Sequence, residues 1–170
     1  LQRIQGELGY IVPLDFASFT VWTSVDYAPG YIMVHAEDPY FQPKLKFEEK
    51  FVYTPGAYFS DNLERKLWTE GYLGKGLTDY SLEIDEQGKA WWVVTVFKPT
   101  ISFGGDKVLG VVIMDPTNGQ HKFYSMEEIP DWVDRVIPND LVSYYLRMNG
   151  EFSSGWLNSW WGKKNLTEPE

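Results

Sequence analysis

Two segments in the middle of the chain, Ala90–Phe97 and Val108–Met114, carry apolar side chains at almost every position. Each is far shorter than the ~20 apolar residues that a membrane-spanning helix needs. Both have the length of a β-strand, and a strand that is apolar at consecutive positions buries both of its faces. Turn sequences bound the pair, with Asp85–Gly88 before the first segment and Asp115–Gly119 after the second. The sequence therefore predicts a sheet whose central strands are covered on both sides.

Two flanking segments extend this sheet. Asp79–Ile84 alternates polar and apolar residues, which is typical of a strand with one face in water, and His121–Tyr124 has the length of a short last strand. Since turn sequences or loops connect the four strands in order, we expect an antiparallel meander. The fold class that we predict is α+β, a meandering antiparallel sheet with helices packed on it.

A helix is expected on one face of the sheet. The segment Ser60–Gly71 begins at an N-capping residue, either Ser60 or Asp61, and aligns Leu63 and Leu67 on one side. A single helix covers a single face, so the other face needs a cover of similar size. The covers that we expect are the helices of residues 126–149, among them one at Asn139–Asn149, or a second sheet. The Trp156–Trp161 segment and the N-terminal strands are further candidates.

The N-terminal part of the chain is predicted to contain more strands. Aromatic and β-branched residues or period-two spacing favour strands at Phe19–Val25, Tyr31–Ala36 and Lys44–Thr54. Glu49 interrupts the apolar face of the third, so a bulge or an exposed edge is expected there. Residues 1–12 are ambiguous and leave open a short helix that ends near Gly9.

We expect a single domain over residues 1–162 and a flexible tail over residues 163–170. One weak internal similarity leaves open a division into two related halves, residues 1–54 and 55–162. Gly30–Val34 and Gly110–Met114 are both apolar strand segments that lead to an Asp-Pro pair. Chance recurrence of strand and turn sequences is the favoured explanation.

The charge and the cysteine content exclude several functions. The formal net charge is −9, and no run of lysine and arginine is present, so nucleic acid is not an expected partner. The chain has no cysteine, which excludes thiol catalysis, cysteine-based zinc sites and disulfides, and mildly favours an oxidising compartment. It begins at Leu1 rather than Met, which suggests a mature or excised piece of a longer protein.

No pattern typical of an enzyme stands out. The two histidines, His35 and His121, are not accompanied by further imidazoles, and the sequence has no nucleophile elbow and no phosphate-binding loop. We therefore predict no catalytic residues, no metal and no cofactor. Acidic pairs such as Asp131 and Asp134 keep an acidic-residue hydrolase open as a third hypothesis.

The C-terminal aromatic residues are the best predicted binding residues. Trp156, Trp160 and Trp161 lie within six residues of one another, and tryptophan is common at protein interfaces and on sugar-binding surfaces. Packing in the core is the more ordinary role for such a cluster. A ligand or partner surface at these three residues is the alternative.

Residues of about 58–125 resemble the PepSY type of extracytoplasmic domain. One part of the resemblance is Glu83–Val94, which has the sequence of a strand, a turn that ends in glycine and a second strand. The other part is Gly110–Gly119, which is similar to the closing Val-x-Asp-x-x-Thr-Gly element of that family. Asn118 stands where that family usually has Thr. The helix at Ser60–Gly71 occupies the expected place. Tyr53–Phe59 resembles extracytoplasmic stretches of large bacterial membrane proteins.

This resemblance implies a periplasmic or cell-surface location, within a membrane-associated protein, and binding or modulation of another protein. It carries no catalytic residue across. Our first hypothesis is a non-enzymatic interaction or sensor domain whose partner is another protein or a domain of the same parent chain. The alternative is a carbohydrate or cell-wall binding module that uses Trp156, Trp160 and Trp161.

Overall fold

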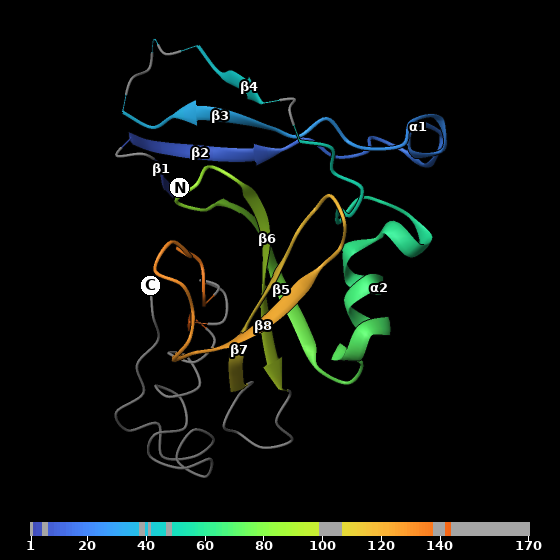
Figure 1. The fold of residues 1–170 in the computed structure, drawn as a ribbon, viewed down its shortest axis with the longest axis vertical. Coiled ribbons are helices and arrows are strands. Elements are labelled where there is room, and N and C mark those ends of the chain that lie inside the picture. The colour runs from blue at the N-terminus through green and yellow to red at the C-terminus, as the bar shows by residue number, and fades with distance from the viewer. Residues whose placement is uncertain are drawn as a thin grey trace, which may run out of the picture.

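The computed structural model describes residues 2–4, 7–37, 40, 42–46, 49–98, 107–137 and 142–143. They form two four-stranded antiparallel sheets, and the strands of each sheet follow one another in sequence order (Figure 1). The first sheet contains β1 (Gln2–Ile4), β2 (Glu7–Pro13), β3 (Tyr31–His35) and β4 (Lys44–Lys46). The second contains β5 (Gly76–Ile84), β6 (Ala90–Lys98), β7 (Lys107–Met114) and β8 (His121–Ser125).

The helical elements are short. They are α1 (Phe19–Ser24), a 3-10 turn (Phe59–Asp61), α2 (Leu63–Leu67) and a wider final turn (Trp68–Tyr72). The described part of the chain is thus mostly antiparallel sheet with little helix. The sheet of the predicted α+β class is therefore confirmed, whereas the short helices support that class only weakly.

The predicted meander is confirmed as the second sheet. Its two middle strands are the two apolar segments, and Val94 on β6 lies opposite Val112 on β7 with both side chains fully buried. Each neighbouring pair is antiparallel, and the Asp115–Gly119 turn connects β7 to β8 as predicted. Burial on both faces explains why these strands show no polar alternation.

One face of this sheet packs on α2 and on the first half of the chain. Trp92, Val94 and Val96 of β6 share a core with Leu63 and Leu67, the two helical residues that the sequence placed on one face. The helix begins later than predicted, because the side chain of Asn62, rather than Ser60 or Asp61, accepts a hydrogen bond from the Arg65 amide. The final turn ends at Tyr72, one residue beyond the predicted stop, and Gly71 within it has a left-handed φ of +114°.

The other face is covered by residues 129–136, an irregular segment that we call the strap. Val93 of β6 and Val111 and Ile113 of β7 form a second core with Val133 of the strap. Ile129, Trp132 and Val136 pack against the same core. The strap lies within residues 126–149, where the sequence offered helices as the cover, but its residues form turns and irregular chain instead of helix. Two further candidates, Asn139–Asn149 and Trp156–Trp161, lie outside the described residues except for 142–143.

In the first half, one local prediction is wrong, one ambiguous segment is resolved, and one strand is shorter than predicted. Phe19–Val25 contains helix α1 instead of a strand, and Ser18 caps it by accepting from the Val21 amide. Residues 2–13 contain the strands β1 and β2 instead of a helix. The strand that begins at Lys44 ends at Lys46, and Phe51 makes only an isolated bridge to Ala28. Tyr31–Ala36 is confirmed as β3.

The alternating strand β5 also differs from expectation. Its polar residues were predicted to face water, yet Ser81 and Glu83 are buried, and only 3% of Glu83 is exposed. The strap lies over this part of the strand and excludes water from it, as its hydrogen bonds to Glu83 demonstrate.

Candidate functional site

Helix α1 is the most unusual element on the surface. It has six residues, and none of them is buried. Figure 1 shows it at the end of the first sheet, beyond β2 and β3 and away from the second sheet. Phe19 is 47% exposed and Val25, which follows the helix, is 46% exposed. A short helix with no buried residue gains little stability from the core, so core packing does not account for its apolar residues.

The aromatic residues of α1 form a cluster with a second segment. Phe19 and Trp22 lie beside Tyr58 and Phe59, which precede α2, with ring centroids 5.2 to 6.2 Å apart across the two segments. The pair Phe19–Tyr58 is edge to face. Phe59 has a φ of +51°, a conformation that bulky residues rarely adopt. We call these four side chains the aromatic cluster.

Asp15 holds α1 in this position. One carboxylate oxygen accepts from the Thr54 hydroxyl at 2.5 Å and from the Phe16 amide at 2.7 Å, and the other accepts from the Gly56 amide at 2.7 Å. A side chain at Gly56 would lie within 2.8 Å of this carboxylate, so the close approach requires glycine. These contacts connect the start of the α1 segment to the turn before α2 and orient it before any partner binds.

A groove lies between α1 and the chain that follows it. Its volume is about 470 Å³, and its apolar lining consists of Phe16, Val21, Val25, Ala28 and Pro29. Asp15, Asp26 and Tyr27 complete the rim. The groove thus offers an apolar floor beside two carboxylates, and the one ammonium group described next to its lining is that of Lys50, 4.9 Å from the centre of the Tyr27 ring. An apolar side chain with a neighbouring positive charge has the matching chemistry.

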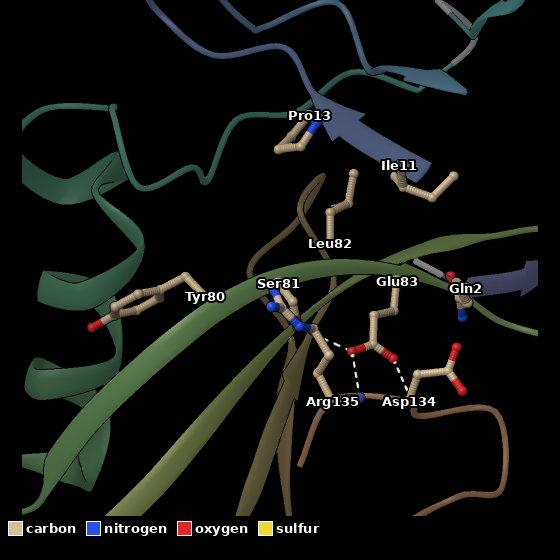
Figure 2. Close-up of a pocket in the computed structure, with 9 residues that line it drawn as sticks. All are labelled: Gln2, Ile11, Pro13, Tyr80, Ser81, Leu82, Glu83, Asp134 and Arg135. Carbon is tan, nitrogen blue, oxygen red and sulfur yellow. Dashed lines mark hydrogen bonds between the residues drawn. The ribbon is translucent and has the colours of Figure 1, made fainter. Parts of the chain in front are cut away.

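A second, smaller pocket lies between the strap, β5 and β2 (Figure 2). Its volume is about 160 Å³, and Glu83 lies in its wall. The Glu83 carboxylate accepts from the amides of Asp134 at 2.8 Å and Arg135 at 3.2 Å and from the Ser81 hydroxyl at 3.0 Å. Burial raises the pKa of Glu83, although these hydrogen bonds act in the opposite direction. Both carboxylate oxygens hold the strap, so the structure gives Glu83 an anchoring role.

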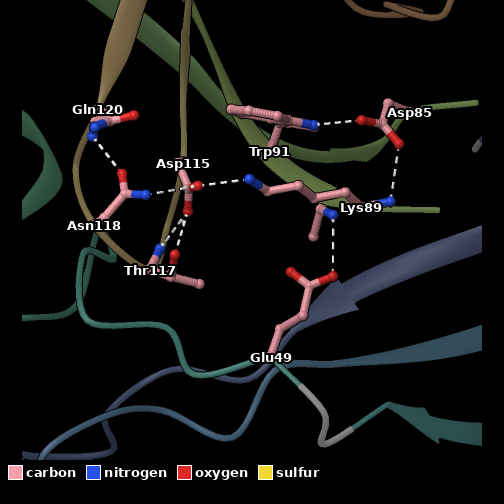
Figure 3. Close-up of polar contacts among 9 residues, drawn as sticks. Glu49, Asp85, Lys89, Trp91, Asp115, Thr117, Asn118 and Gln120 are labelled. Atoms are coloured by element: carbon pink, nitrogen blue, oxygen red, sulfur yellow. Dashed lines mark hydrogen bonds and ion pairs between the residues drawn. The ribbon is translucent and has the colours of Figure 1, made fainter. Parts of the chain in front are cut away.

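A polar network connects two hairpin turns at one end of the second sheet (Figure 3). Lys89 contacts the buried Asp115 at 2.6 Å, and Asp115 also accepts hydrogen bonds from Thr117 and Asn118. Although burial acts to raise it, the hydrogen bonds from Lys89 and Thr117 hold the pKa of Asp115 below its usual range. Through these contacts Asp115 stabilises the turn between β7 and β8.

Glu49 lies beside this network. One carboxylate oxygen accepts from the Ala90 amide at 3.2 Å, and the other is buried without a hydrogen-bond partner among the described residues. Burial raises the pKa of Glu49, partly opposed by the Ala90 amide and by Lys89. The residue predicted to disturb a strand therefore joins the first half of the chain to the second sheet.

The residues that the sequence singled out are dispersed. Trp156, Trp160 and Trp161 lie outside the described residues. His121 packs on Tyr72, with a ring nitrogen 3.2 Å from Glu70, and His35 accepts from the Glu37 amide. Within the described ranges, no group of three or more His, Cys, Asp and Glu residues is placed to hold a metal ion.

Sequence reasoning missed the α1 groove, although the sequence contains a signal for it. Phe19 and Trp22 are three apart, Val21 and Val25 are four apart, and Ser18 precedes them as a capping residue. Helical spacing after a cap outweighs the β-branched composition that favoured a strand.

Comparison with protein-family models, with curated proteins and with solved structures gives no match to this chain. In the part of the chain that the structure describes, no helix has the length and apolar character needed to cross a membrane.

Proposed function

We propose that this chain is an interaction domain that binds a segment of another protein in the groove between α1 and residues 26–29. The observation that carries the proposal is that α1 buries none of its residues and exposes Phe19 and Val21, while Asp15 holds the segment in place. Contiguous apolar surface on a folded domain marks a partner site more often than chance exposure does.

The lining of the groove supports a specific partner chemistry. Val21 and Val25 favour an apolar side chain, and Asp15 and Asp26 at the rim favour a lysine or arginine next to it. The net charge of −9 acts in the same direction at longer range. The partner that we propose is therefore a protein segment with an aliphatic or aromatic residue beside a basic one. Phe19 and Trp22 of the aromatic cluster lie on the same helix as Val21 and would extend the contact surface.

The resemblance to the PepSY type supports the same class of function and gives it a setting. On that basis the domain acts outside the cytoplasm, within a larger membrane-associated protein. Its partner is either a separate protein or another domain of the parent chain. Binding, rather than catalysis, is the activity that we propose.

Selection of 12-residue peptides from a random displayed library tests this function. We expect enriched peptides to contain an apolar residue next to Lys or Arg and to lose at least tenfold in affinity against the Val25→Glu variant. Leu73→Glu is the matched control, because Leu73 is 81% exposed and is not part of the groove lining. The proposal fails if no peptide is enriched, or if the enriched peptides bind both variants equally.

A further inference from the structure

A third hollow lies between the strap and the second sheet, on the face opposite α2. Its volume is about 350 Å³, which is within the range of small-molecule sites. Three aromatic side chains from three elements line it: Trp91 of β6, Tyr124 of β8 and Trp132 of the strap. Ile113 and Pro130 contribute further apolar surface. We propose that this hollow binds a saccharide.

The orientation of Trp91 is fixed before any ligand arrives. Its indole Nε1 donates to Asp85 at 2.8 Å (Figure 3). The Asp85 carboxylate also accepts from the amides of Gln87 and Lys89, so its own position is fixed. The Lys89 ammonium lies 4.2 Å from the centre of the Trp91 ring. A flat aromatic surface held rigidly is what the apolar face of a sugar ring requires, because little freedom is lost on stacking.

Trp132 is held through its backbone. Its carbonyl oxygen accepts from the Gln2 side chain at 3.2 Å, and the next residues of the strap are bound to Glu83. The aromatic surface contributed by the strap is therefore anchored to both sheets, at β1 and at β5.

The rim of the hollow supplies polar groups of the kind that hydroxyls need. Gln120 and Lys122 are both exposed. The backbone of Gln120 donates to Asn118, whereas its side-chain amide makes no hydrogen bond to another described residue. A primary amide offers two donors and an acceptor, and an ammonium offers three donors. Stacking surface with convergent amide and ammonium groups matches a polyhydroxylated ring.

The same rim disfavours a cationic ligand. Three aromatic rings could otherwise form a cage for a quaternary ammonium. Here Lys89 already lies over Trp91, and the Lys122 ammonium lies 4.6 Å from the centre of the Tyr124 ring. A second cation would be repelled by both. An uncharged sugar is repelled neither by these ammonium groups nor by the Asp85 carboxylate that also lines the hollow. The lining residues differ from Trp156, Trp160 and Trp161, which the sequence suggested.

Titration calorimetry with the full chain tests the proposal, with cellotetraose, chitotetraose, maltotetraose and tri-galacturonate as probes and choline as a cationic comparison. We expect at least one of the oligosaccharides to bind with a dissociation constant of about 1 mM or tighter. Trp132→Ala should weaken that binding at least tenfold. Gln120→Ala, at an exposed position, should weaken it about threefold or more without loss of fold. Trp68→Ala is the matched control, since Trp68 is 41% exposed on the opposite face and should leave affinity unchanged.

Two further outcomes would overturn the proposal. One is failure of all four oligosaccharides to bind, whether or not choline binds. The other is sugar binding that survives Trp132→Ala and Gln120→Ala but is lost when Trp156, Trp160 and Trp161 are all replaced by Ala. If Trp132→Ala unfolds the protein, the result for Gln120→Ala decides.

Discussion

The side-chain amide of Gln2 hydrogen-bonds both the amide nitrogen and the carbonyl oxygen of Ile84, each at 2.8 Å. Ile84 is the last residue of β5, the edge strand of the second sheet. Gln2 therefore takes the place that a neighbouring strand would occupy and satisfies two backbone groups that would otherwise be buried without a partner. The first sheet is joined to the second through a single side chain at this point.

Replacement of Gln2 by Ala should destabilise the protein by about 1–3 kcal/mol, because it leaves the Ile84 amide and carbonyl unsatisfied. Urea denaturation followed by fluorescence measures the effect. The neighbouring Arg3 is exposed, and Arg3→Ala is expected to change the free energy of unfolding by less than about 0.5 kcal/mol. Equal effects of the two substitutions would contradict the role given to Gln2.

Replacement of Glu83 by Gln should change how stability depends on pH. Because burial raises the pKa of Glu83 above its ordinary value of 4.5, the folded state holds this proton more tightly than the unfolded state does. The free energy of unfolding therefore falls as pH rises from about the ordinary value through the folded-state pKa. Glu83→Gln should lack this component, measured by denaturation at a series of pH values.

Glu49→Gln is the matched variant for that experiment, since burial also raises the pKa of Glu49. For each variant, the free energy of unfolding should decrease less with rising pH than it does for the unmodified chain. A pH profile of Glu83→Gln that parallels the unmodified chain would refute the assignment.

Asp115 should show the opposite pH dependence. Its folded-state pKa lies below the ordinary 3.8, so its stabilising contribution is complete above that value and disappears as pH falls through the folded-state pKa. At neutral pH, Asp115→Ala should cost about 1–3 kcal/mol, because the buried hydrogen bonds to Thr117 and Asn118 are lost. The difference between variant and parent should shrink in acid, and a difference that is constant with pH would argue against this contribution.

Val94→Ala and Val112→Ala should each destabilise the protein by about 1–3 kcal/mol through lost burial and the cavity that remains. The two residues lie opposite each other, so the double variant is expected to deviate from the sum of the single effects. Val12→Ala is a control at an exposed strand position. Unchanged denaturation midpoints for both core variants would contradict the burial seen here.

The second sheet was predictable because its signals are local. Apolar residues at consecutive positions indicate that both faces are buried in Ala90–Phe97 and in Val108–Met114, and turn residues lie between the strands. The location of the strap was predictable, since residues 129–136 lie within the 126–149 region expected to cover the sheet. Its conformation was not, because Ile129, Trp132, Val133 and Val136 have helical spacing, whereas the segment forms turns and irregular chain held by contacts to distant residues. For the same reason Glu83 looked like a water-facing residue. Its cover lies 51 and 52 positions further along the chain.

The two candidate sites also differ in whether the sequence contains a local signal for them. The α1 groove depends on whether Phe19–Val25 is read as strand or helix, and its composition and its spacing disagree. The prediction followed the composition, whereas the structure has a helix that is capped by Ser18. The aromatic hollow combines Trp91, Tyr124 and Trp132 from three elements, so no linear motif could reveal it.

The strap also has a kinetic consequence. Strands β5 to β8 pair only with sequence neighbours, so the meander can form through short loop closures. The strap and Gln2 join β5 from positions 51 to 82 residues away, which requires much longer closures. We expect these contacts to be absent from the folding transition state and to act mainly on the rate of unfolding. Loss of the Glu83 anchor would then shorten the lifetime of the native state while the chain still folds at nearly its original speed.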